Sequence, residues 1–174
     1  QDMQDYGFIP NLNMTSEEFW GETEAFRKKN YMEGILGYMY YMMYKCKEKG
    51  IPFTQEYLRS LGKNINFYKG VQNWFKRINQ YGESIGVNIE HYVISSGLKD
   101  IIDGSAIKDE FKKVFACQYY FDESGNADNS YKMIVLDNGK GIGLKDDQFY
   151  DARKYKDAAF VYLYPGYTYS SVNM

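Results

Sequence analysis

The chain has 174 residues, 44% of them hydrophobic, and a formal net charge of −2. This length suits one domain, or one domain with a modest insertion, and the apolar content is enough to build a buried core. The nearly balanced charge gives no electrostatic reason to expect binding to nucleic acid or to an anionic membrane surface. We therefore expect neither nucleic acid nor membrane as a partner.

The cysteines and the apolar segments exclude further classes of protein. Cys46 and Cys117 are too few for a disulfide framework and lack metal-ligand spacing, so we expect both to be buried in a reducing compartment. Residues 1–5 carry neither the basic region nor the apolar run of a signal peptide. The most apolar stretch, residues 35–44, is too short to span a bilayer. These features predict a soluble, cytoplasmic protein.

The N-terminal third of the sequence has helical periodicity after an irregular start. Residues 1–14 contain Gly, Pro and Asn and predict no long element. Thr15 can cap a helix, and Glu18 stands three residues later, as in a capping box. A second helix is predicted over residues 31–49, where apolar residues recur at helical intervals. Its Met and Tyr side chains could line an adaptable pocket, but packing in the core is the expected role.

Two further helices are predicted, over residues 55–61 and about 68–82. Each begins after turn-forming residues and carries an apolar stripe at helical spacing. The side chains expected to be buried on the second and fourth helices are Ile35, Leu36, Met39, Trp74 and Phe75.

The stretch from residue 87 onward organises the rest of the chain. Its apolar, β-branched residues predict a largely buried strand that ends at Ser95, Ser96 and Gly97, after which helical spacing resumes at residues 98–103. In open α/β sheets, ligands bind at the carboxyl ends of strands, and free N–H groups there favour an anion. A serine at such a turn can also serve merely as a helix N-cap.

The secondary structure of the last part of the chain is harder to predict. Helical spacing recurs at residues 106–113, and a strand is predicted over residues 114–121, closed by a turn at 122–126. Residues 133–163 then suggest a helix end, a short strand, a helix and a last strand. His91, the only histidine, lies among apolar residues, so we expect it to be packed rather than catalytic.

Three segments together resemble a known family. Residues 67–71 (Phe-Tyr-Lys-Gly-Val), the helix that continues to residue 86, and residues 92–98 (Tyr-Val-Ile-Ser-Ser-Gly-Leu) resemble haloacid dehalogenase superfamily hydrolases, most of all the phosphoserine-phosphatase-like branch. The resemblance implies an α/β fold, with a Rossmann-like parallel-sheet core and an inserted N-terminal helical cap. It also implies Mg²⁺-dependent hydrolysis of a small phosphorylated metabolite through an aspartyl-phosphate intermediate.

The same resemblance divides the chain into three parts. Residues 1–10 would be a linker that follows a missing first strand. Residues 11–66 would form the helical cap, and residues 67–174 would form an α/β core that is incomplete in this sequence.

The resemblance also assigns candidate site residues. Ser95 falls at the family's Ser/Thr motif, and the N–H groups of Ser96 and Gly97 beside it would help to bind the phosphoryl group. Lys132 lies where a phosphate-binding lysine could sit, although a solvated surface lysine is the alternative. Asp137 is the candidate Mg²⁺ ligand.

The family's other motifs are absent. No Asp-x-Asp nucleophile motif occurs in the sequence, so no catalytic residue is assigned. Asp100 and Asp103 are three residues apart and fall on a predicted helix. The fourth motif near Asp137 lacks its second acid.

Two explanations for these absences remain open. The chain is either a catalytically degenerate module that binds phosphate, another anion or a protein, or a sequence from which segments before residue 1 and near residues 127–133 are omitted. We favour omission because a sheet without its central strand would expose two unpaired edges. The N-terminal residues should then lie beside the strand that carries Ser95. A third hypothesis, a helical interaction protein, rests on the composition of the second helix alone.

Overall fold

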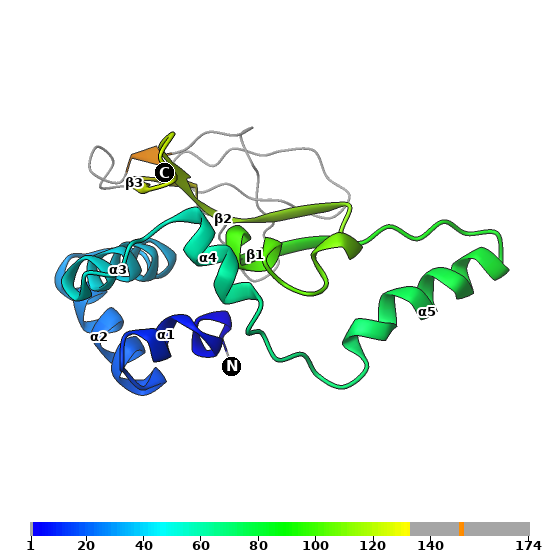
Figure 1. Cartoon of the computed structure of the whole chain (residues 1–174), viewed down its shortest axis with the longest axis horizontal. Helices are drawn as coiled ribbons and strands as arrows, with labels where there is room; N and C mark the ends of the chain where they lie inside the picture. Colours follow the sequence, from blue (N-terminus) through cyan, green and yellow to red (C-terminus); the bar gives the residue numbers. More distant parts are fainter. Residues whose placement is uncertain (1, 133–149, 152–174) are drawn as a thin grey trace.

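The computed structural model of the chain describes residues 2–132 and 150–151. Helices fill the N-terminal half, and a sheet follows (Figure 1). Within the described ranges, no helix has the length and apolar character that a membrane crossing requires. In chain order, the elements are the 3₁₀ helix η1 (Met3–Tyr6), α1 (Phe8–Asn11), α2 (Ser16–Lys29), α3 (Gly34–Lys49), α4 (Gln55–Gly62), α5 (Val71–Ser84), β1 (Tyr92–Leu98), α6 (Lys99–Asp103), the 3₁₀ helix η2 (Lys108–Glu110), β2 (Lys113–Phe121), β3 (Ala127–Lys132) and β4 (Tyr150–Asp151).

The start of α2 is set by the capping box that the sequence predicts. The Glu18 backbone N–H donates to Thr15 Oγ at 3.2 Å, and the Thr15 N–H donates to the Glu18 carboxylate at 2.8 Å. Two backbone donors that have no partner inside the helix are thereby satisfied. The next helix, α3, begins later than predicted, at Gly34, where the Glu33 carboxylate accepts from the first turn.

The sheet combines one parallel pair with an antiparallel hairpin. β1 runs parallel to β2 and is joined to it through α6, while β3 pairs antiparallel with β2 and β4 with β3. The predicted turn at residues 122–126 closes the hairpin, where Asp122 Oδ1 accepts from the N–H groups of Ser124 and Asn126, each at 2.9 Å. The fold is thus mixed α/β. The strand over residues 127–132 was not predicted.

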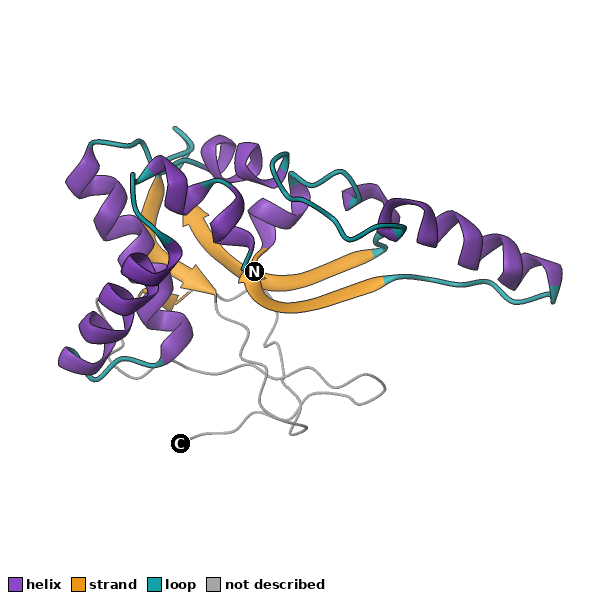
Figure 2. Cartoon of the chain, turned by 90° about the horizontal axis from the view of Figure 1, so that it is seen from below, coloured by secondary structure: helices purple, strands orange, loops and turns teal. Residues whose placement is uncertain are grey.

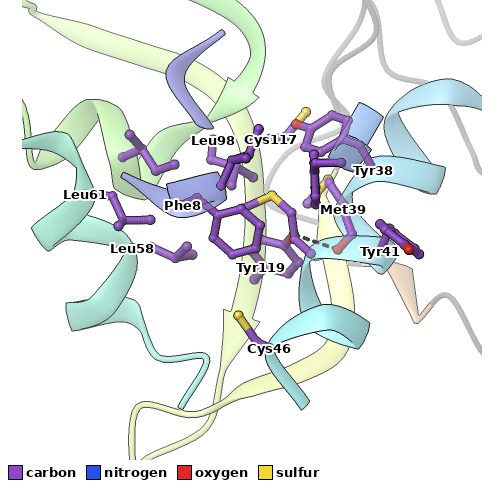
Figure 3. Packing of buried hydrophobic residues seen from close by; sticks show 14 of the residues in the cluster. Phe8, Tyr38, Met39, Tyr41, Cys46, Leu58, Leu61, Leu98, Cys117 and Tyr119 are labelled. Atoms are coloured by element: carbon purple, nitrogen blue, oxygen red, sulfur yellow. Dashed lines mark hydrogen bonds between the residues drawn. The ribbon is translucent and has the colours of Figure 1, made fainter. Parts of the chain in front are cut away.

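A single hydrophobic core joins the N-terminal helices to β1 and β2. Tyr119 of β2 is 1% exposed and donates its hydroxyl hydrogen to the Met39 carbonyl of α3 at 2.8 Å (Figure 3). Its ring meets Phe53 edge to face, with ring centroids 4.8 Å apart. The cluster therefore includes residues from both sides of the predicted boundary between residues 66 and 67.

Two glycines allow α4 and α6 to pack in close contact. A Cβ atom on Gly62 would lie 2.1 Å from the Ile101 carbonyl oxygen, and one on Gly104 would lie 1.8 Å from the Arg59 carbonyl oxygen. Both contacts are with backbone atoms, which cannot move aside as a flexible side chain would. The two positions must lack side chains for the helices to meet in this way.

The N-terminal segment contains two short elements. The sequence predicted no long element over residues 1–14, and η1 and α1 have four residues each. Phe8 and Ile9 are 0% and 2% exposed, so α1 is part of the core. Their burial was not predicted, because Gly7 and Pro10 on either side of them read as turn signals. The assignment of residues 1–10 as a linker stays a prediction.

Residues 63–91, which we call the arm, extend away from the other helices (Figures 1 and 2). The arm consists of α5 and the segment that returns along it, where Ile89 covers Gly82. Phe75 at its base meets Phe111 edge to face at 5.5 Å. Residues 2–91 contain no strand, as the predicted helical half requires.

The predicted burial of α3 and α5 was correct in part. Leu36, Met39 and Phe75 are buried, and Ile35 is partly buried against the core. Trp74 is 47% exposed, so its predicted burial was wrong. The strand begins later than predicted, at Tyr92. It was also predicted to be largely buried, whereas most of β1 is only partly buried.

Candidate functional site

The candidate site lies where β1 leads into α6. Ser95, Ser96 and Gly97 form a bulge in β1, because Ile94 pairs with Phe115 whereas Leu98 pairs with Cys117. Within the bulge, the Gly97 N–H donates to Ser95 Oγ at 2.9 Å. The hydroxyl that sequence reasoning assigned to phosphate is therefore held against its own backbone. All three residues are partly buried.

The N-terminal residues lie over this bulge, beside β1, as the omission hypothesis predicts. The Leu98 N–H donates to Met3 Sδ at 3.4 Å. A Cβ atom on Gly97 would lie 2.5 Å from the Met3 methyl carbon and 3.1 Å from Ser95 Oγ. Any side chain at residue 97 would therefore displace the flexible end of Met3, which fills the space next to the bulge.

Helix α3 holds the bulge from another direction. The Tyr38 hydroxyl donates to the Ser96 carbonyl oxygen at 2.6 Å. Burial raises the pKa of Tyr38 well above its ordinary value, so this phenol remains a donor throughout the neutral range. The Ser96 carbonyl oxygen is therefore tied to α3. The N-terminal helices position the loop on which the family resemblance depends.

The described strands place Ser95 differently from the prediction. We expected it at the carboxyl end of a central strand, but β1 is the edge strand in the order β1-β2-β3-β4. Ser95 also lies three residues before the end of β1, within the bulge. The Rossmann-like arrangement implied by the resemblance is thus limited, in the described residues, to one parallel β1–α6–β2 unit.

The acids near the site have separate partners. Asp100 is 1% exposed, and its Oδ1 accepts from Gln55 Nε2 at 2.9 Å while Arg59 Nε lies 3.7 Å away. Its Oδ2 is buried and has no hydrogen-bond partner among the described residues. Burial raises the pKa of Asp100. Asp103 instead pairs with Lys99 at 2.5 Å, so the two aspartates do not act together.

The remaining candidates do not join Ser95 in the described residues. The backbone of Lys132 lies in β3 opposite Gln118, and nothing is described of its side chain. Asp137 lies outside the described residues. Over residues 2–132 and 150–151, no three His, Cys, Asp or Glu side chains are grouped to hold a metal ion. The described side chains therefore do not fit a Mg²⁺ site. The assignments of Lys132 to phosphate binding and of Asp137 to Mg²⁺ binding stay predictions.

His91 and the cysteines occupy packed positions, as expected. His91 Nε2 lies 2.8 Å from Asn79 Oδ1, and its ring packs edge to face against Trp74 and Phe75. Cys46 and Cys117 are both buried, and neither forms a disulfide among the described residues. Burial raises the pKa of Cys46 to about 12, which removes it as a nucleophile near neutral pH.

A polar groove of about 600 Å³ was missed by sequence reasoning. Arg59 and Lys63 border it from α4 and the turn after it, and Lys108 borders it from η2. These residues are far apart in sequence and belong to no motif. Only the glycine contact between α4 and α6 brings them together, and no sequence signal reveals that contact without the structure.

Comparison with known proteins identifies one distant relative. It is an uncharacterized protein of Borreliella burgdorferi, 28% identical over 141 residues, which amount to 75% of this chain and 45% of the relative. The chain thus spans less than half the length of that relative. No family model matches the chain. The class established by the fold is a mixed α/β protein with an N-terminal helical half.

Proposed function

We propose that the chain is the phosphate-binding part of a Mg²⁺-dependent phosphatase-like hydrolase that acts on a small phosphorylated metabolite. The observation that carries the proposal is the β1 bulge, where the Ser95 hydroxyl and the Gly97 N–H lie together in a parallel β1–α6–β2 unit. Such junctions are common sites for anions in α/β proteins. The N-terminal segment beside β1 is a second support.

In this proposal, the chain's own residues bind and orient. The Ser95 hydroxyl would turn from the Gly97 N–H to the phosphoryl oxygens, and both groups would then serve as donors. The Met3 side chain would have to move away from Gly97 for an anion to approach. Because no Asp-x-Asp occurs in the sequence, the nucleophile and its metal ligands are assigned to protein beyond these residues.

The second candidate is a non-catalytic module that binds phosphate or another anion on the same scaffold. One observation favours it. Residues 127–132, where omission would place a break, form the strand β3, which pairs with β2.

The test uses the longest natural gene product that contains this sequence. Turnover of p-nitrophenyl phosphate is measured with and without Mg²⁺, and binding of inorganic phosphate is measured by calorimetry. Because Ser95→Ala loses one charge-assisted hydrogen bond, its kcat/KM should be about ten- to a hundredfold lower than that of the wild type. Ser16→Ala, at the exposed start of α2, is the matched control and should have no effect.

The outcomes separate the two candidates. Mg²⁺-dependent turnover that falls in Ser95→Ala supports the hydrolase. Phosphate binding that falls in Ser95→Ala, without any turnover, supports the binding module. Activity or binding that is the same in both variants removes Ser95 from the site and overturns both candidates.

A further inference from the structure

The Met- and Tyr-rich helix α3 has two different faces. One face packs in the core through Tyr38, Met39, Met42 and Cys46. Other residues of α3, separated by three or four positions, line a groove of about 750 Å³. The residues of this α3 groove that matter here are Tyr40, Met43, Tyr44 and Lys47 from the helix, and Ile51 and Phe53 from the segment after it.

The aromatic rings of the α3 groove pack against other aromatic rings that hold them in place. Phe26 of α2 stacks on Tyr40, with centroids 5.5 Å apart and planes 10° apart. It also stacks on Tyr44 at 6.2 Å and 21°. On the other side of the groove, Phe53 is fixed by its edge-to-face contact with the buried Tyr119. Rings fixed in this way lose little conformational freedom when another ring stacks on them.

Two charged side chains border the groove, Lys47 and Glu48. The Glu48 carboxylate accepts from Lys45 Nζ at 2.9 Å, a lysine that also pairs with Glu22 at 3.0 Å. Lys47 forms no ion pair within the part of the chain that the structure describes, and its side chain is exposed. A ligand that enters the groove would therefore meet aromatic faces, a thioether and one free ammonium group.

We propose that the α3 groove binds a small molecule with a planar aromatic ring and an anionic group. The ring stacks on Tyr44 and Tyr40, and the anionic group pairs with Lys47. The volume of about 750 Å³ falls within the range of known small-molecule sites. The site shares no residue with the β1 bulge, so the inference stands apart from the proposed function.

The inference is tested by calorimetry with two non-hydrolysable probes. These are the anionic 2-naphthalenesulfonate and the neutral 2-naphthalenemethanol. Tyr44→Leu keeps apolar bulk but removes the stacking face, and should weaken both probes about tenfold. Lys47→Gln should weaken the sulfonate about threefold and leave the alcohol unchanged. Tyr81→Leu and Lys76→Gln, at exposed positions of the arm, are the matched controls and should bind both probes like the wild type.

Tyr44 is 45% exposed, so Tyr44→Leu should fold normally, which circular dichroism checks. Tyr40→Leu gives a second, independent loss of stacking. The inference is overturned if neither probe binds up to its solubility limit, or if Tyr81→Leu weakens binding as much as Tyr44→Leu. It is equally overturned if Lys47→Gln affects the neutral alcohol and the sulfonate alike.

Discussion

The N-terminal helices and the arm have similar amphipathic sequences but differ in how completely their apolar side chains are buried. In α3, the apolar residues meet α2 on one side and β2 on another, so Met39 is completely buried. In α5, the stripe meets the returning segment and Phe111 among the described residues, and Trp74 and Tyr81 remain 47% and 62% exposed. A helical pattern therefore predicts the helix, but burial depends on whether another element covers the stripe.

The largest expected effect comes from the glycine contact between α4 and α6. Gly104→Ala should destabilise the protein by about 4 kcal/mol or more, because its Cβ would collide with the Arg59 carbonyl oxygen and force the helices apart. Urea unfolding followed by circular dichroism measures the change. Gly21→Ala is the matched control, since nothing lies within 4 Å of its Cβ in the exposed part of α2. It should stabilise the protein by about 0.5–1 kcal/mol.

Truncating one aromatic side chain in each region tests the comparison directly. Phe19→Ala removes a side chain that is 0% exposed and should cost about 3 kcal/mol. Trp74→Ala removes a larger side chain, but one that is 47% exposed, and should cost about 1 kcal/mol or less. Equal losses in urea unfolding would show that the arm is covered as well as the core is.

Amide hydrogen exchange should separate the regions without any mutation. Peptides from α5 should exchange at least about tenfold faster than peptides from α3, a difference of about 1.4 kcal/mol in opening free energy. The physical reason is that fewer side chains of α5 than of α3 are buried. Similar protection in both helices, measured by mass spectrometry, would mean that the arm opens only with global unfolding.

The smallest effect concerns the polar link between α2 and α3. Glu22 accepts from the Tyr41 hydroxyl at 2.5 Å and lies 3.0 Å from Lys45 Nζ. The Tyr41 and Lys45 hydrogen bonds lower the pKa of Glu22, so its contribution is complete above its ordinary pKa near 4.5 and is lost as the pH falls through the lower folded value. Glu22 is half exposed and solvent screens the pair, so this contribution is less than about 1 kcal/mol.

Glu22→Gln measures that contribution. The variant should be slightly less stable than the wild type at neutral pH, and the difference should shrink below pH 4.5. Denaturant unfolding at several pH values provides the data. A difference that grows as the pH falls would contradict the assigned role of Glu22.

Local signals in the sequence predicted the elements better than their surroundings. The capping box at Thr15 and the turn after Asp122 act within a few residues, so both were read correctly. Trp74 was wrongly predicted to be buried, because helical periodicity does not reveal whether another element covers the apolar stripe. The strand β3 was missed because its polar residues resemble loop composition.

The candidate site shows the same division. The sequence predicted that a strand ends at residues 95–97 and leads into a helix. The structure has β1 leading into α6, but the strand continues to Leu98 and bulges at these residues. The contacts of Met3 and Tyr38 with that bulge could not be predicted from the sequence, because each joins segments far apart in the chain. The α3 groove likewise depends on Phe53 and Asn126, which only tertiary folding brings to the helix.

The paired glycines of α4 and α6 also constrain how this sequence can diverge. A Cβ atom on Gly62 would meet the backbone of Ile101 and Gly104, and one on Gly104 would meet the backbone of Arg59, so enlarging one residue cannot be compensated by any change at the other. Selection can therefore keep the helix crossing only by keeping both residues. A homologue with side chains at both positions should have its α4 and α6 farther apart, and the groove bordered by Arg59, Lys63 and Lys108 should be reshaped in that lineage.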